Sequence, residues 1–270
     1  SDLGGGGGGA AFGGALFIAS GAEIEIVDSV TFTSNTVTAG FSAGDGGIGA
    51  ADGADLFLMS GVNATFDIGA GKSLTFDPAI GNDDGVNFGV GLVKEGDGTL
   101  RLTGTSLFGG GILVDRGELV IDGTSNNISN IVDHGTLTVN GTVGGQTLAN
   151  TGTINVNSAG VINGDVATVA GLVTVNGTIN GDVYIADDGV LKGSGTITPS
   201  NNSSGAVEVF GTIAPGNSIG TLHINGDYLQ GYQGTYEVEV NAAGQSDKIE
   251  ISGAAFLSCG CLPGDGGNVH

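Results

Sequence analysis

Histidine, serine and acidic side chains are the groups in this sequence that could do chemistry. A serine-protease triad needs a serine nucleophile, a histidine base and an aspartate that orients the histidine. His134 and His223 lie in or beside short alternating segments, at places where neighbouring segments carry Thr or Asn. We therefore expect them to be exposed strand histidines. Gly193-Ser194-Gly195 is only superficially similar to the Gly-x-Ser-x-Gly elbow of serine hydrolases.

Paired carboxylates could instead hydrolyse or cleave polysaccharides, which requires two carboxyl groups about 5–10 Å apart. The acidic pairs Asp83-Asp84 and Asp187-Asp188 both precede glycine. Aspartate before glycine is common in turns and needs no catalytic explanation. We predict no catalytic residues and that the chain is not an enzyme, with a carbohydrate-active enzyme as an alternative.

Calcium is the ion that the sequence predicts, at one acidic loop. The segment from Gly44 to Leu56 is similar to the Gly-Gly-x-Gly-x-Asp repeats of calcium-binding β-rolls. Asp45, Asp52 and Asp55 would be its oxygen donors. The alternative is a solvated acidic loop, since residues 40–53 are expected to form a flexible excursion. No other cofactor is predicted.

The two cysteines are Cys259 and Cys261, near the C-terminal end of the sequence. A structural metal site needs about four ligands, and His134, His223 and His270 lie far from the pair in sequence. A disulfide-stapled fold is excluded because no second region holds a partner cysteine. We expect the pair to be inert or locally oxidised.

The charge balance is strongly acidic, with 28 Asp and Glu against 6 Lys and Arg and a net charge of −22. Nucleic acids and anionic lipid headgroups are bound by clustered Lys and Arg. We therefore expect no nucleic-acid partner. A run of about 18 apolar residues, which a membrane-spanning helix requires, does not occur, so direct membrane insertion is not expected.

A repeat must position these groups, and it runs from Gly98 to Val238. The pattern is Gly-x-Φ-x-Φ, where Φ is an apolar residue, as in Gly135-Thr-Leu-Thr-Val139. Its glycines recur at nearly regular intervals that shorten toward the end: Gly98, Gly117, Gly135, Gly152, Gly171, Gly189, Gly205, Gly220 and Gly234. Such a period is typical of one supersecondary unit stacked on copies of itself.

Each period contains a second short strand, such as Gly177-Thr-Ile179. A period of about 18 residues then closes a circuit of three short strands, and the next coil lies about 4.8 Å away. We expect Val, Ile and Leu to point inward, and Thr, Asn, Ser and acidic residues to point outward. Glycine at each corner is expected to supply positive φ angles. Before Gly98, the segments 23–27, 30–33, 64–68 and 73–76 alternate as strands do.

Several motifs resemble the passengers of bacterial autotransporters. Gly96-Asp-Gly-Thr-Leu-Arg-Leu-Thr-Gly104 and Val114-Asp-Arg-Gly-Glu-Leu-Val-Ile-Asp-Gly123 are similar to the passenger-associated repeat. Gly211-Thr-Ile-Ala-Pro-Gly-Asn-Ser-Ile-Gly-Thr-Leu222 is similar to the C-terminal part of such passengers. Gly13-Gly-Ala-Leu16 and Phe32-Thr-Ser-Asn35 are similar to tetrapeptides of polymorphic outer-membrane proteins.

This resemblance implies an all-β, right-handed parallel β-helix, a three-sided β-solenoid with essentially no helix. We expect a Gly-rich N-terminal part over residues 1–97, regular coils over 98–253 and an irregular tail over 254–270. The implied function is adhesion or self-association at the bacterial cell surface, with a fibre or surface-layer subunit as an alternative. Partners would be surface molecules of host or neighbouring cells, or other copies of the chain in a homo-oligomer or fibre. No translocator barrel is recognisable in the sequence, so outer-membrane association would depend on a translocator outside it.

Overall fold

A computed structural model describes residues 8–19, 23–26, 28–41, 47–59, 63–77, 80–82, 91–106, 109–200 and 206–258. Within these ranges every regular element is a β-strand and no helix occurs. The pairings between named strands are parallel throughout, as in Thr153–Val156 against Leu172–Val175. These observations confirm the predicted all-β fold built from parallel sheets. The chain divides into two compact units near residue 140, which are described separately.

In the first unit, residues 1–137 and 141–145, the described residues form five sets of paired strands. Two are short, β1 (Ala11–Phe12) with β5 (Ala51–Asp52), and β14 (Thr124–Ser125) with β17 (Thr142–Gly144). A third has the order β2 (Leu16–Ile18), β6 (Leu56–Leu58), β9 (Ile80–Asn82). The fourth runs β3 (Glu23–Ile26), β7 (Asn63–Ile68), β10 (Gly91–Glu95), β12 (Gly111–Val114), β15 (Asn130–Asp133). The fifth runs β4 (Val30–Thr33), β8 (Ser73–Asp77), β11 (Thr99–Leu102), β13 (Glu118–Ile121).

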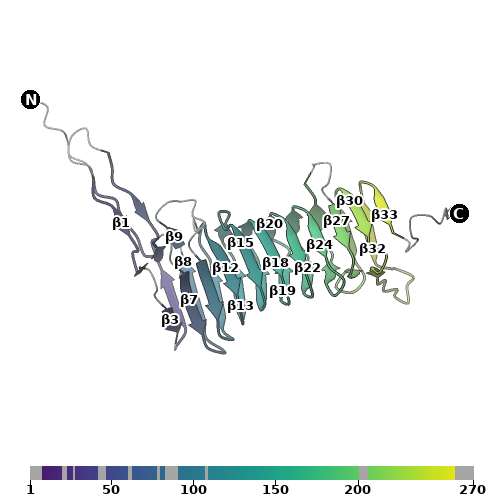
Figure 1. The fold of residues 1–270 in the computed structure, drawn as a ribbon, viewed down its shortest axis with the longest axis horizontal. Helices are drawn as coiled ribbons and strands as arrows, with labels where there is room; N and C mark the ends of the chain where they lie inside the picture. The colour runs from purple at the N-terminus through teal and green to yellow at the C-terminus, as the bar shows by residue number, and fades with distance from the viewer. Residues whose placement is uncertain are drawn as a thin grey trace, which may run out of the picture. The chain divides into compact units, whose positions relative to one another are not determined.

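In the second unit, residues 138–140 and 146–270, each turn of the solenoid gives one strand to each of three sheets (Figure 1). The first sheet runs β18 (Gln146–Ala149), β21 (Val166–Thr168), β24 (Val183–Ile185), β27 (Ala206–Val209), β30 (Asp227–Gln230), β33 (Ala255–Leu257). The second runs β19 (Thr153–Val156), β22 (Leu172–Val175), β25 (Val190–Gly193), β28 (Thr212–Pro215), β31 (Thr235–Tyr236). The third runs β20 (Val161–Asn163), β23 (Thr178–Asn180), β26 (Thr196–Thr198), β29 (Thr221–Ile224), β32 (Lys248–Ile251). The strand β16 (Thr136–Val139) spans the boundary between the units.

The register between coils follows the period of the sequence. Thr153 pairs with Leu172, and Leu172 pairs in turn with Val190. Each step advances the chain by about one period, so equivalent side chains of successive coils stack in rows. The predicted solenoid, with three short strands in each coil, is therefore confirmed.

The inward rows are mainly aliphatic. Ile154, Val173 and Leu191 occupy one row of the second unit and are fully buried. Polar residues are also fully buried, which contradicts the expectation that only Val, Ile and Leu point inward. The polar side chains with no exposed surface are Asp55, Lys94, Ser125, Asp133 and Thr147.

Positive φ explains only some of the corner glycines. Gly117 has a φ of 71°, which favours glycine. Gly135 is not among the residues with positive φ, but a Cβ atom there would lie 2.5 Å from the carbonyl oxygen of Gly117. At this corner glycine is needed because the backbones of successive coils approach closely.

Part of the expected excursion over residues 40–53 is ordered into strands. Ala51 and Asp52 form β5, which pairs with β1 through Ala11 and Phe12. The N–H of Gly40 also donates to the carbonyl oxygen of Gly9. Small residues permit this close pairing, since a Cβ on Gly49 would lie 2.0 Å from the oxygen of Gly9.

Candidate functional site

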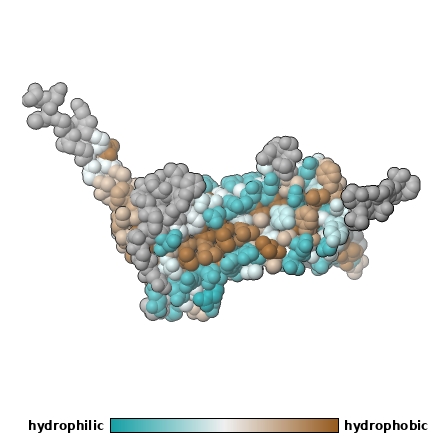
Figure 2. All heavy atoms as spheres, viewed as in Figure 1, coloured by the Kyte–Doolittle hydropathy of each residue, from teal (hydrophilic) through white to brown (hydrophobic). Residues whose placement is uncertain are grey.

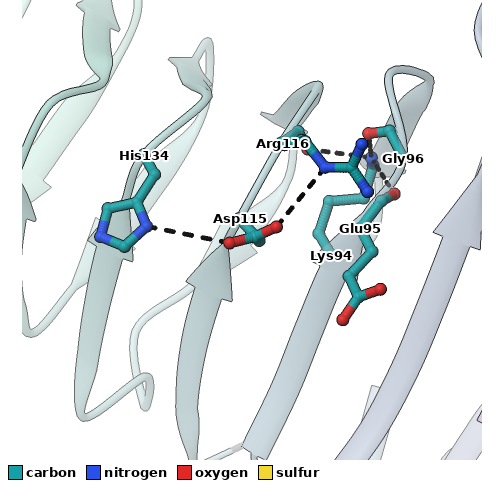
Figure 3. A network of polar contacts seen from close by, with 6 residues as sticks. All are labelled: Lys94, Glu95, Gly96, Asp115, Arg116 and His134. Carbon is teal, nitrogen blue, oxygen red and sulfur yellow. Dashed lines mark hydrogen bonds and ion pairs between the residues drawn. The ribbon is translucent and has the colours of Figure 1, made fainter.

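A network of polar side chains lies where the coils of β10, β12 and β15 leave their sheet (Figure 3). It begins with Lys94, which pairs in register with Phe66 on one side and Val114 on the other. Both neighbours are buried and point inward. Lys94 therefore points into the solenoid from an inward position, in place of an apolar side chain.

The ammonium group of Lys94 donates hydrogen bonds to three backbone carbonyl oxygens. Nζ lies 2.6 Å from the oxygen of Glu95, 2.8 Å from that of Gly96 and 3.1 Å from that of Arg116. Burial lowers the pKa of Lys94 from 10.5 to about 8, while the carboxylates of Asp67 and Asp97 act to raise it. Because the three oxygens belong to two successive coils, the side chain ties those coils together.

Asp115 lies between two partners on the outside of the same corner. Its Oδ2 is 3.5 Å from Nε of Arg116, and its Oδ1 is 3.9 Å from Nδ1 of His134 (Figure 3). Asp115 and His134 hold the same place in successive coils, since their N–H groups bond to the oxygens of Lys94 and Val114. Stacking of equivalent positions thus brings together an acid and an imidazole that are one full period apart in the sequence.

The second described histidine makes a closer pair. His223 in β29 pairs in register with Glu250 in β32, and its Nδ1 lies 3.2 Å from Oε2 of Glu250. Thr196 in β26 is its register partner on the other side. An imidazole beside a carboxylate is also how the base and the orienting residue of a serine-protease triad are arranged. Among the described serines, the Ser200 hydroxyl donates to Asp182 and the Ser194 N–H donates to Asn176, so neither of these groups is bonded to His223.

The candidate calcium donors are only partly described, because Asp45 lies outside the described residues. Oδ1 of Asp52 accepts from the N–H of Gly53 at 2.7 Å. Buried Asp55 accepts from Nδ2 of Asn35 at 2.7 Å and from the N–H of Asp77 at 2.6 Å. Both oxygens of Asp55 are thus used by the fold, and the calcium hypothesis stays a prediction.

The remaining candidates are the two acidic pairs and the two cysteines, and only one of the acidic pairs lies among the described residues. Asp187 and Asp188 are exposed in a turn, as their context predicts. Asp83, Asp84, Cys259 and Cys261 lie outside the described residues. Among those that are described, no group of three or more His, Cys, Asp or Glu is placed to hold a metal ion. The described ranges also contain no helix long and apolar enough to span a bilayer.

Pockets lie on the described part of the second unit. One, of about 260 Å³, is lined by Asp165, Asp182, Tyr184, Glu208 and neighbouring residues of the first sheet. The other, of about 190 Å³, lies beside Lys192, Pro215, Ser218 and Asp247. The first combines an exposed aromatic ring with three carboxylates and has no basic residue in its lining.

Sequence reasoning missed Lys94 and the outward apolar residues, although a signal for both was present. In Gly91-Leu-Val-Lys-Glu95, Lys94 has the same parity as inward Leu92. Strict alternation therefore places Lys94 inward. Val93 has the opposite parity and is an apolar residue facing outward.

The chain is similar to two curated proteins, each named "Extracellular serine protease" and each from Serratia marcescens. One is 34% identical over 145 residues, covering 54% of this chain and 12% of the relative. The other is 31% identical over 119 residues, covering 44% of this chain and 11% of the relative. These partial similarities are consistent with an autotransporter passenger region but are not specific to one. No family model matches the chain, and no solved structure is significantly similar to it.

The names of these relatives contradict the prediction that the chain is not an enzyme, because both are called serine proteases. The prediction relied on finding no triad among residues of a repeat. Such a search reports only on the repeat, whereas the name belongs to a protein of which the matched stretch is about one eighth. The residues of the repeat alone therefore do not decide whether the whole protein is an enzyme.

Proposed function

We propose that this chain is the β-helical stem of an autotransporter-type passenger, and that its protein acts outside the cell as a serine protease. One combination of observations supports this proposal. A parallel β-solenoid with the passenger-associated motifs is 34% identical over 145 residues to an extracellular serine protease. The names of the relatives favour proteolysis over the carbohydrate chemistry considered as an alternative.

The stem supplies a rigid support in this proposal. Strands of successive coils pair along each sheet, so each backbone N–H and C=O in a strand interior has a fixed partner. A repeat of this kind is stabilised by neighbouring coils and has no single keystone. The net charge of −22 keeps such a surface soluble outside the cell.

The proposal is tested on the full reading frame that encodes this chain, expressed with its own secretion signals. We expect casein to be hydrolysed by the culture supernatant, and hydrolysis to stop with a serine-directed sulfonyl fluoride. Labelling with a fluorophosphonate, followed by peptide mapping, would identify the reactive serine. Secretion without inhibitor-sensitive hydrolysis, or retention of the protein inside the cell, would overturn the proposal.

Adhesion to host or neighbouring cells is a second candidate, favoured by exposed apolar side chains on the outside of the solenoid. Tyr184 is 45% exposed and Phe256 is 57% exposed, although both lie on strands. Binding of the purified 270-residue chain to immobilised cells, lost on substitution of Tyr184, would support it. Growth of fibres with protein concentration would favour the alternative of self-association.

A further inference from the structure

An outward row of side chains on the first sheet of the second unit is largely apolar. Its members are paired in register from one strand to the next: Leu148, Ala167, Tyr184, Glu208, Leu229 and Phe256. We call these six residues the outer row. Tyr184 and Phe256 expose about half of their surface, and the ring of Tyr184 lies 5.5 Å from that of Phe210.

The corresponding rows of the third sheet are mainly polar, although Val161 pairs with Thr178 in one of them. Thr178 pairs with Thr196, and Asn163 pairs with Asn180, whose side chains also bond to each other at 2.9 Å. His223 and Glu250 continue that face. A sheet with one solvated face is expected to be polar on that face. The third sheet follows this rule and the outer row does not, so the requirements of the fold do not explain the apolar residues of the outer row.

Carboxylates border the outer row. Asp165, Asp182 and Asp227 precede its strands or begin them, and each has one oxygen held by a backbone N–H of the following coil or of a nearby loop. The pocket over Ala167 and Tyr184 is lined by Asp165, Asp182 and Glu208 and by no basic residue. Figure 2 shows a hydrophobic band bordered by hydrophilic surface on one face of the molecule.

We propose that the outer row is a docking surface for a basic polypeptide segment of a partner protein, in which arginine and aliphatic side chains alternate on one face. An arginine guanidinium would stack on the ring of Tyr184 and pair with Glu208. Guanidinium groups are suited to both contacts because they are planar, weakly hydrated and always charged. Aliphatic side chains of the segment would cover Leu229 and Phe256.

The acidic charge around the outer row favours a basic partner over a second copy of this chain, nucleic acid or anionic lipid. A second copy of this chain carries 28 acidic and 6 basic residues, so it would bring carboxylates against carboxylates. Nucleic acid and anionic lipid are disfavoured for the same reason. A basic segment neutralises the border while its apolar side chains leave water. This inference does not depend on the proposed protease activity.

The test uses the whole 270-residue chain and a nine-residue peptide in which arginine and leucine alternate at every second position, with serine between them. Side chains two residues apart lie on one face of an extended peptide. Binding is measured by fluorescence anisotropy at low salt, against a control peptide with glutamate in place of arginine. We expect the arginine peptide to bind and the glutamate peptide not to bind.

Two substitutions locate the site. Glu208→Gln removes one charge, and Tyr184→Ser removes the ring from an exposed position. Each should weaken binding about fivefold, the scale of one exposed cation–π or ion-pair contact. The matched control Asp188→Asn removes the same charge from an exposed turn of the same unit and should change affinity less than about twofold. Circular dichroism confirms that the variants fold.

The outcomes separate the proposal from its rivals. The docking surface is supported if the arginine peptide binds the wild-type chain, and if Glu208→Gln and Tyr184→Ser weaken that binding. The control Asp188→Asn should leave it unchanged. Equal loss in all three variants means nonspecific attraction to an acidic protein and overturns it. Absence of binding also overturns it, as does concentration-dependent self-association that Tyr184→Ser abolishes.

Discussion

Nζ of Lys94 lies 3.1 Å from the carbonyl oxygen of Arg116, which belongs to the next coil of the solenoid. The same ammonium group bonds to Glu95 and Gly96 in its own coil. One buried side chain therefore connects two coils through their backbone. This is a stabilising device that the hydrophobic rows of the solenoid do not supply.

Replacing Lys94 by methionine should destabilise the protein. The substitution keeps a long side chain in the inward row but leaves three carbonyl oxygens without their donor. Unsatisfied buried polar groups cost about 1–3 kcal/mol. We expect a fall of that size in the free energy of unfolding, measured by urea denaturation. Lys192→Met is the control, since Lys192 is only half-buried, and an equal fall there would contradict the assigned role.

The stability contributed by Lys94 should also depend on pH. Its pKa is about 8 in the folded protein, against an ordinary value of 10.5, mainly because burial disfavours the charged form. Between these values the unfolded chain binds more protons than the folded one, so stability rises with pH in this window. Below about pH 8 both states are protonated and the cost of burying the charge is present in full.

We therefore expect the stability of the wild-type protein to increase relative to Lys94→Met between pH 8 and 10. Comparing the two proteins cancels other groups, such as Tyr228, whose pKa is raised by burial. The difference is measured by urea denaturation at each pH. A constant difference across this range would show that Lys94 does not titrate as the structure indicates.

Val156→Asp should destabilise the second unit strongly. Val156 is fully buried in β19, and an uncompensated buried charge costs about 3–5 kcal/mol. The adjacent Asn155 points outward, so Asn155→Asp is the matched control and should change stability by less than about 0.5 kcal/mol. Thermal unfolding followed by circular dichroism compares them. Similar melting temperatures for both variants would show that the assignment of the two faces is wrong.

Gly135→Ala should also destabilise the fold, for a steric reason. The added methyl group would lie 2.5 Å from the oxygen of Gly117 and 3.2 Å from Cγ1 of Val114. Overpacking of this kind costs about 1–3 kcal/mol. Gly69→Ala is the control, because the nearest atom to its methyl group is Cγ of Lys72 at 3.9 Å. If Gly135→Ala unfolds at the same urea concentration as the wild-type protein, the coils do not approach as closely as described.

The sequence by itself determined the repeat, the parallel stacking and most of the core. Gly-x-Φ-x-Φ motifs at a nearly constant step require short strands joined by tight corners, and period-two alternation assigns residues such as Ile154 and Val173 to the inside. These conclusions depend only on the local geometry of strands and corners, which can be inferred from the spacing of apolar residues and glycines along the sequence.

Only the tertiary structure decided which residues depart from the pattern. Lys94 is stable inside the solenoid because carbonyl oxygens of its own corner and of Arg116, in the next coil, converge on its ammonium group. Asp55 is likewise held by Asn35 and Asp77. The outer row exists because register aligns Tyr184, Glu208 and Leu229, which come from three successive coils. Burial of a polar group and exposure of an apolar one both depend on neighbours brought in by stacking, and alternation along one strand does not specify those neighbours.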